Sequence, residues 1–110
     1  MSFLVACDSP DGEAVVNRDG EELGHLEQIV IDARSGRAAY AVLARGGVFG
    51  LGERFHAVPW QAFEIDANRR RIVLDIARER LDAAPGFDEE HWPAIHEAGW
   101  ATAIHAFYGI

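Results

Sequence analysis

Residues 37–60, RAAYAVLARGGVFGLGERFHAVPW, decide the fold of this chain. Residues 38–44 are apolar on both alternating faces, which is typical of a strand covered on both sides by other elements. A second short strand over 55–58 ends at Pro59 and Trp60, because proline lacks the backbone donor that a sheet needs. Between the two strands lie glycines that allow turns where a Cβ would clash: Gly46, Gly47, Gly50 and Gly52. This order predicts a small sheet that bends into a barrel.

Further short strands flank this stretch, each bounded by turn residues. The expected strands are 14–16, 23–32, 38–44, 55–58, 64–66 and 71–76. In the second of them the apolar alternation slips near His25–Gln28, which predicts a β-bulge. Six short strands at this spacing predict an all-β fold, a small antiparallel barrel with short C-terminal helical segments.

The chain divides into three expected parts. Residues 1–12 form an N-terminal segment, residues 13–80 the barrel, and residues 81–110 a C-terminal extension that includes a helix. This helix has one apolar face, which we expect to pack on the barrel or on a second copy of the chain. The face consists of Trp100, Ile104, Phe107 and Tyr108. Deletion of residues 91–110 is expected to lower thermal stability and to abolish a dimer.

Composition limits the classes of protein to consider. A chain of 110 residues forms one domain with enough buried surface to fold without a disulfide, and Cys7 is its single cysteine. The net charge of −8 argues against binding to nucleic acid or to an anionic membrane surface. No apolar run approaches the roughly 20 residues of a membrane span, and no signal peptide is recognisable. We therefore expect a cytoplasmic protein without direct membrane insertion.

Three segments together resemble a known family. They are VVNRDGEELGHLEQIVIDARSGRAAYAVLARGG at 15–47, AVPW at 57–60 and APGFDEEHWP at 84–93. The sequence is similar to the PRC-barrel domain proteins from about residue 15 to residue 108. This family includes the cytoplasmic barrel of the photosynthetic reaction centre H subunit and the C-terminal domain of a bacterial ribosome maturation factor. The resemblance implies a compact β-barrel that scaffolds protein–protein contacts and has no known catalytic site.

Motifs for catalysis or cofactor binding are not found in the sequence. The spacing of His91, His96 and His105 does not bring three imidazoles together on a straight helix, and no HExxH or Cys/His zinc spacing occurs. No GxSxG motif surrounds a serine, and the glycines of residues 46–52 lack the Lys-Ser/Thr of a phosphate loop. We therefore expect no enzyme activity, no catalytic residues, no metal and no cofactor.

The leading hypothesis is a non-catalytic interaction or scaffold module that forms a homodimer and contacts an unidentified protein partner. The residues expected to shape the barrel or to carry these contacts are Gly46, Gly47, Pro59, Trp60, Trp92, Trp100, Ile104, Phe107 and Tyr108. One alternative is an accessory subunit of a membrane-bound electron-transfer complex, which rests on family analogy. Another is an enzyme or a small-ligand-binding barrel that uses the barrel mouth near His56 and Trp60.

Overall fold

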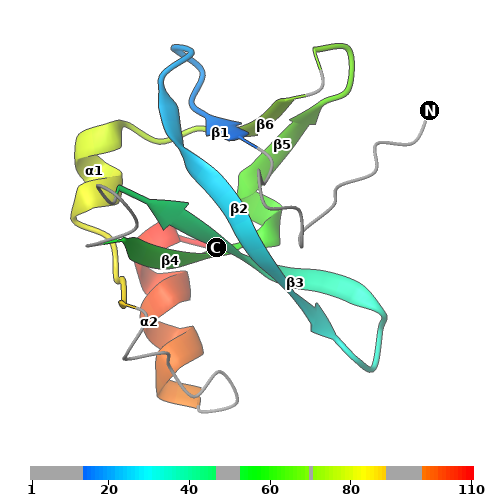
Figure 1. Cartoon of the computed structure of the whole chain (residues 1–110). Helices are drawn as coiled ribbons and strands as arrows, with labels where there is room; N and C mark the ends of the chain where they lie inside the picture. The colour runs from blue at the N-terminus through cyan, green and yellow to red at the C-terminus, as the bar shows by residue number, and fades with distance from the viewer. Residues whose placement is uncertain (1–13, 47–52, 70, 89–97) are drawn as a thin grey trace.

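The computed structural model describes residues 14–46, 53–69, 71–88 and 98–110 (Figure 1). Its elements in chain order are β1 (Ala14–Val16), β2 (Glu22–Asp32), β3 (Arg37–Arg45), β4 (Arg54–Pro59), the 3-10 turn η1 (Trp60–Ala62), β5 (Phe63–Asp66), β6 (Arg71–Leu74), α1 (Arg78–Asp82) and α2 (Ala98–Tyr108). The predicted mostly β fold of six strands with a helical C-terminal part is confirmed for the described residues. The expected N-terminal segment 1–12 lies outside them, as do Gly47 and Trp92.

The six strands form one curled sheet in the order β4-β3-β2-β1-β6-β5. Four neighbouring pairs are antiparallel, but β1 and β6 run parallel, with Val15 opposite Ile72. The prediction of a wholly antiparallel sheet is wrong at this pair, because no tight turn joins β1 to β6 and turn chemistry therefore does not set their direction. β4 and β5 are the two edges, so the described strands form a half-barrel, and a closed barrel is not seen.

The predicted β-bulge in β2 is confirmed. Leu26 lies opposite Leu43 and Gln28 lies opposite Val42, so that Glu27 is the extra residue. The backbone of β2 also comes very close to β3 at Gly24, where a Cβ would lie 2.4 Å from the carbonyl oxygen of Ala44. The bulge and this close approach allow the sheet to curl tightly.

The sheet is packed on both faces of β3, as the two-faced apolar pattern predicts. Residues Ala41–Ala44 are all buried. Ala41 and Leu43 belong to the main core cluster, whereas Val42 and Ala44 pack with Phe55 in a second cluster on the opposite face. The main cluster is completed by residues from β1, β2, β4, β6 and α1: Val15, Leu23, Leu26, Val58, Ile72, Leu74, Leu81 and Ala84.

β1 is short, and hydrogen bonds of the Asn17 side chain fix its C-terminal end. Asn17 directly follows it and is buried, and its Oδ1 accepts hydrogen bonds from the backbone N–H groups of Asp19 and Glu21. The Nδ2 of Asn17 contacts the carbonyl oxygen of Ile76, 59 residues further along the chain, at 3.4 Å. The buried asparagine therefore closes its own turn and joins it to the segment after β6.

The C-terminal helix α2 packs against β4, at the lower side of the sheet in Figure 1. Ile104 is its buried residue, and Phe107 and Tyr108 lie against the main core cluster. Among the described residues, no helix is both long enough and apolar enough to cross a membrane.

Candidate functional site

The apolar face of α2 contacts the chain's own sheet. The sequence left open whether this face covers the barrel or a second copy, and in the structure it covers the half-barrel. The Trp100 ring meets the Tyr40 ring of β3 edge to face, with 5.0 Å between the centroids. Phe107 and Tyr108 meet in the same way at 4.9 Å. These aromatic residues therefore stabilise the fold.

Polar contacts fix the end of α2 against β3 and α1. The Tyr40 hydroxyl lies 2.6 Å from Nε2 of His105, and Nδ1 of the same ring lies 2.7 Å from the carbonyl oxygen of Ile110. Because a carbonyl can only accept, Nδ1 carries the proton and Tyr40 donates to Nε2. Arg80 of α1 donates to the carbonyl of Phe107 at 3.1 Å, and its guanidinium lies 4.7 Å from the centre of that ring.

The two tyrosines of this region differ in their polar partners. Burial raises the pKa of Tyr108 to about 12, and its hydroxyl is buried without a hydrogen-bond partner among the described groups. Burial also raises the pKa of Tyr40, whose hydroxyl is satisfied by His105. Both tyrosines therefore remain neutral near pH 7. Of the two hydroxyl groups, that of Tyr40 forms a hydrogen bond within the described residues and that of Tyr108 does not.

The remaining predicted residues of the barrel lie at strand ends. Pro59 ends β4 and is buried, and the Trp60 ring packs 5.7 Å from that of Phe63 and against the main core cluster. Gly46 follows β3 with φ of 72°, a backbone conformation that favours glycine. The structure thus places these residues at strand ends of the half-barrel and gives Pro59 and Trp60 packing roles.

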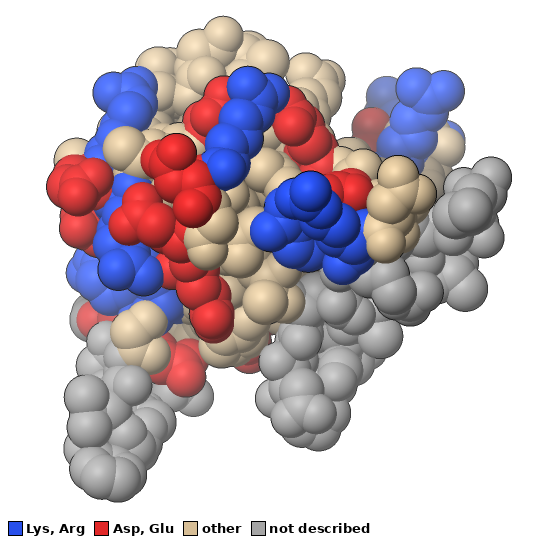
Figure 2. Space-filling model, turned by 90° about the horizontal axis from the view of Figure 1, so that it is seen from above, with Lys and Arg blue, Asp and Glu red and all other residues tan. Residues whose placement is uncertain are grey.

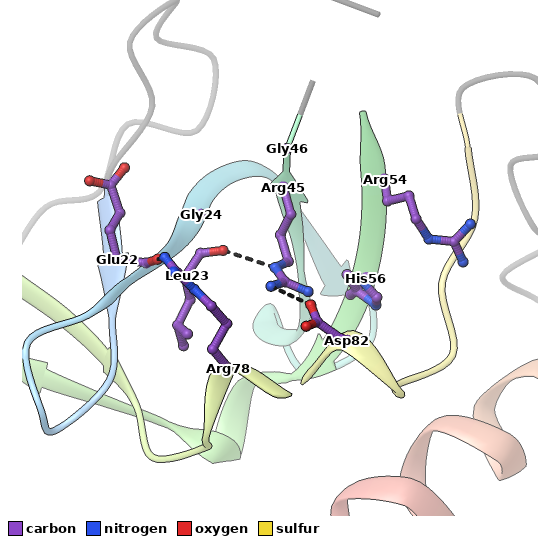
Figure 3. A pocket seen from close by; sticks show the side chains of 9 residues that line it. All are labelled: Glu22, Leu23, Gly24, Arg45, Gly46, Arg54, His56, Arg78 and Asp82. Atoms are coloured by element: carbon purple, nitrogen blue, oxygen red, sulfur yellow. Dashed lines mark hydrogen bonds and ion pairs between the residues drawn. The ribbon is translucent and has the colours of Figure 1, made fainter. Parts of the chain in front are cut away.

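A cleft of about 570 Å3 opens where β2, β3, β4 and α1 meet (Figure 3). It is lined by Glu22, Leu23, Gly24, Arg45, Gly46, Arg54, His56, Arg78 and Asp82. The sequence hypothesis placed a ligand near His56 and Trp60, and the cleft contains the first of these residues but not the second. The sequence analysis does not identify its arginines as site residues, although Arg45 and Arg54 flank the glycine-rich stretch of residues 46–52.

Arg45 joins three elements at the centre of this cleft. Its Nε donates to the carbonyl oxygen of Leu23 in β2 at 3.0 Å, and its Nη2 lies 2.7 Å from Oδ1 of Asp82 in α1. The Arg45 side chain is only 14% exposed, whereas that of Asp82 is 62% exposed. Arg78 of α1 donates to the carbonyl of Glu22 at 2.6 Å. The arginines therefore stabilise the cleft as well as line it.

His56 forms a buried wall of the cleft. The residue is 1% exposed, and its Nδ1 donates to the carbonyl oxygen of Pro85 at 3.1 Å. Burial lowers the pKa of His56, and the nearby charges of Arg45 and Arg54 lower it further, against the opposing effects of the Pro85 carbonyl and Asp82. The imidazole is therefore neutral near pH 7.

The Pro85-Gly86-Phe87 segment covers His56, which gives these residues of the family resemblance a structural role. A Cβ at Gly86 would lie 2.9 Å from Cε1 of His56, so only glycine permits the observed approach. Phe87 then exchanges backbone hydrogen bonds with Phe55 of β4, at 2.8 and 2.9 Å. The segment thus covers part of the β4 edge and keeps His56 in place.

The outer half of the β2–β3 hairpin, residues 28–40, projects from the sheet (Figure 1). We call it the distal ribbon. Ile31 is its most exposed large apolar residue, with 60% of its surface accessible. Ile29 and Val30 are only partly buried. Apolar side chains thus remain open to solvent on this part of the described surface.

No group of three metal-ligating side chains is found within residues 14–46, 53–69, 71–88 and 98–110. His91 and His96, which the sequence analysis considered with His105, lie outside these ranges. His105 itself is engaged by Tyr40 and the Ile110 carbonyl.

Comparison with known proteins agrees with the architecture described above. The sequence model of the PRC-barrel domain matches residues 4–81, which is more than half of the chain. A search of curated proteins finds no match. The matched range contains all six strands and most of α1. The chain therefore belongs to the PRC-barrel domain family.

Proposed function

We propose that this chain is a non-catalytic cytoplasmic module that acts through protein contacts and forms a homodimer through the distal ribbon. The observation that carries the proposal is the position of Ile31, 60% exposed on a hairpin that extends beyond the rest of the sheet. An exposed apolar side chain among other incompletely buried apolar residues favours an interaction surface.

The apolar character of the distal ribbon supports this function. Ile31 lies opposite Ala38 beyond the main core, whereas Val30 packs against the second core cluster and Tyr40, its partner on β3, packs against Trp100 of α2. A hairpin of two strands is at best marginally stable in water without a covering surface. A partner that covers the ribbon would bury this surface and stabilise it.

The charges of the distal ribbon and the adjoining bulge favour a second copy as the partner. Exposed Glu27 and Asp32 carry negative charge, and exposed Arg34 and Arg37 carry positive charge. A surface that has both signs in equal number can meet its own image across a two-fold axis. The chain as a whole has a net charge of −8, so two copies repel each other least where the local charge is zero.

Light scattering coupled to size-exclusion chromatography tests the proposal over a range of protein concentrations. We expect the unmodified chain to be a dimer and Ile31→Lys to be a monomer with an unchanged circular dichroism spectrum. The matched control is Ile65→Lys, since Ile65 is also a large exposed apolar residue, 40% accessible, but lies on β5. A monomeric unmodified chain, or equal loss of the dimer in both variants, would contradict the proposal.

A further inference from the structure

We propose that the cleft between β2, β3, β4 and α1 binds a small molecule through an oxyanion group, a phosphate or a carboxylate, held by its arginine side chains. This inference adds a ligand site to the interaction module proposed above and does not depend on the dimer. The charge of the cleft, the free N–H groups of its arginines and its size support this ligand class.

The cleft concentrates positive charge in an acidic protein. Arg45, Arg54 and Arg78 come from three different elements, while the net charge of the whole chain is −8. On the face seen in Figure 2, basic and acidic side chains are interspersed. Figure 3 shows that the carboxylate of Glu22 is turned away from the guanidinium groups. Asp82 is thus the carboxylate that lies among the arginines.

Several donors of these arginines remain available. Each guanidinium has five N–H groups. Arg45 uses two in its bonds to Leu23 and Asp82, and Arg78 uses one in its bond to Glu22. The guanidinium of Arg54 forms no hydrogen bond or ion pair among the residues whose positions are described, and in Figure 3 it points away from Arg45, toward the segment that contains Gly86. Paired N–H groups of arginine match the spacing of phosphate and carboxylate oxygens, so these donors suit an oxyanion.

Asp82 shows where an oxyanion can bind. Its Oδ1 already occupies Nη2 of Arg45 at 2.7 Å, yet its side chain is 62% exposed and can turn toward water. Arg45 is held from the other side by the Leu23 carbonyl and is only 14% exposed, so it stays in position when its partner changes. An incoming oxyanion can therefore replace the Asp82 carboxylate on a guanidinium that is already oriented.

The volume of the cleft indicates a ligand larger than a single inorganic ion. About 570 Å3 lies within the range of roughly 300–1,000 Å3 that small-molecule sites occupy. Leu23 supplies an apolar contact beside the arginines. The ligand class is therefore an organic molecule that carries at least one phosphate or carboxylate group.

Isothermal titration calorimetry of the full chain with pyrophosphate and, separately, with citrate tests the proposal, with sodium chloride at equal ionic strength as the reference. Binding of either probe supports the proposal, and the probe that binds more tightly indicates whether phosphate or carboxylate is the preferred group. Arg54→Gln and Arg78→Gln should each weaken binding by about ten-fold, because each removes charge-assisted hydrogen bonds. Arg34→Gln removes the same charge on the distal ribbon and should leave the affinity unchanged.

A further variant gives an effect of opposite sign. Asp82→Asn removes the carboxylate that competes for Arg45 and should strengthen binding of the same probe by several-fold. The proposal would be overturned if neither probe binds, or if Arg34→Gln lowers the affinity as much as Arg54→Gln and Arg78→Gln do. It would also be overturned if a folded Asp82→Asn variant binds the probe more weakly than the unmodified chain. Ile31→Lys should bind the probe with the same affinity as the unmodified chain. Failure of the ligand proposal can therefore be distinguished from failure of the proposed dimer.

Discussion

The inner and outer halves of the β2–β3 hairpin are similar in sequence but differ in their surroundings. The inner half contains Ala41–Ala44, which are buried on both faces, whereas Arg37–Tyr40 in the same strand are exposed or partly buried. Both halves carry alanine and larger apolar residues. The difference comes from the third elements that cover the inner half, α1, β4 and the Phe87 segment. Apolar pattern thus predicts a strand, while burial depends on distant parts of the chain.

The largest expected effect is at Ile104, the buried residue by which α2 packs against the sheet beside β4. Ile104→Ala should lower the free energy of unfolding by about 2–5 kcal/mol, because it removes buried methyl groups and leaves a cavity. Urea denaturation measures the change. Ala106→Ser, at an exposed position of the same helix, should change it by less than about 0.5 kcal/mol. Equal losses would show that α2 does not stabilise the sheet.

An intermediate effect is expected from His56, which lies in β4 beside the inner half. Its surroundings are Arg45 of β3, Arg54 of β4, Asp82 of α1 and the Pro85 carbonyl, and burial lowers the pKa of His56 below the ordinary 6.5. The unfolded chain therefore binds a proton at His56 more tightly than the folded chain does. Above pH 6.5 the imidazole is neutral in both states, so His56 does not lower the free energy of unfolding. As the pH falls below that value, protonation favours the unfolded chain and the free energy of unfolding decreases.

The variant His56→Asn tests this pH dependence. Asparagine keeps an N–H donor for the Pro85 carbonyl but does not titrate. Urea unfolding at about pH 7.5 and about pH 5 should show a smaller acid-induced loss of stability in the variant than in the unmodified chain. The other histidines are present in both proteins, so the difference between the two losses reports His56. Identical losses would contradict the assigned direction of the shift.

A smaller effect is expected at Tyr40, where the covered and uncovered halves meet. Tyr40→Phe should lower the free energy of unfolding by about 0.5–1.5 kcal/mol, because it removes the hydroxyl that donates to His105. Tyr108→Phe is the matched control, since the Tyr108 hydroxyl has no hydrogen-bond partner among the described residues. That control should be neutral or slightly stabilising. The reverse order of the two variants in chemical denaturation would refute this assignment.

The smallest effect is expected in the distal ribbon itself. Ile31→Thr keeps a β-branched residue in β2 and should change the stability of the monomer by less than about 0.5 kcal/mol. The measurement is thermal unfolding at protein concentrations low enough to favour the monomer. A loss comparable with that of Ile104→Ala would mean that the distal ribbon is part of the cooperative core, and the comparison of the two halves would fail.

Local patterns in the sequence predicted the strands, the bulge near Glu27 and the apolar face of α2 because each depends on neighbouring residues. The parallel β1–β6 pair and the charged residues of the cleft were not predicted for the opposite reason, although a ligand site near His56 was one of the alternatives. Arg45, Arg78 and Asp82 meet only after β3 and α1 are brought together by the fold. A charged residue at a strand end looks solvated in a single sequence, and nothing local indicates which distant carbonyl it will contact.

The position of β1 between β2 and β6 has a consequence for the rate of folding. β1 has three residues, and it connects a meander of β2, β3 and β4 to the hairpin of β5 and β6. The meander and the hairpin can each form from contacts between neighbouring segments of the chain. The parallel β1–β6 pair cannot, because its strands are far apart in sequence. The hydrogen bond from Asn17 to the carbonyl of Ile76, next to this pair, spans 59 residues. The chain must lose the conformational entropy of closing this long loop before the contacts between β1 and β6 can stabilise the folded state. We therefore expect the transition state for folding to be reached when β1 docks on β6, so that substitutions at Val15 slow refolding more than they speed unfolding.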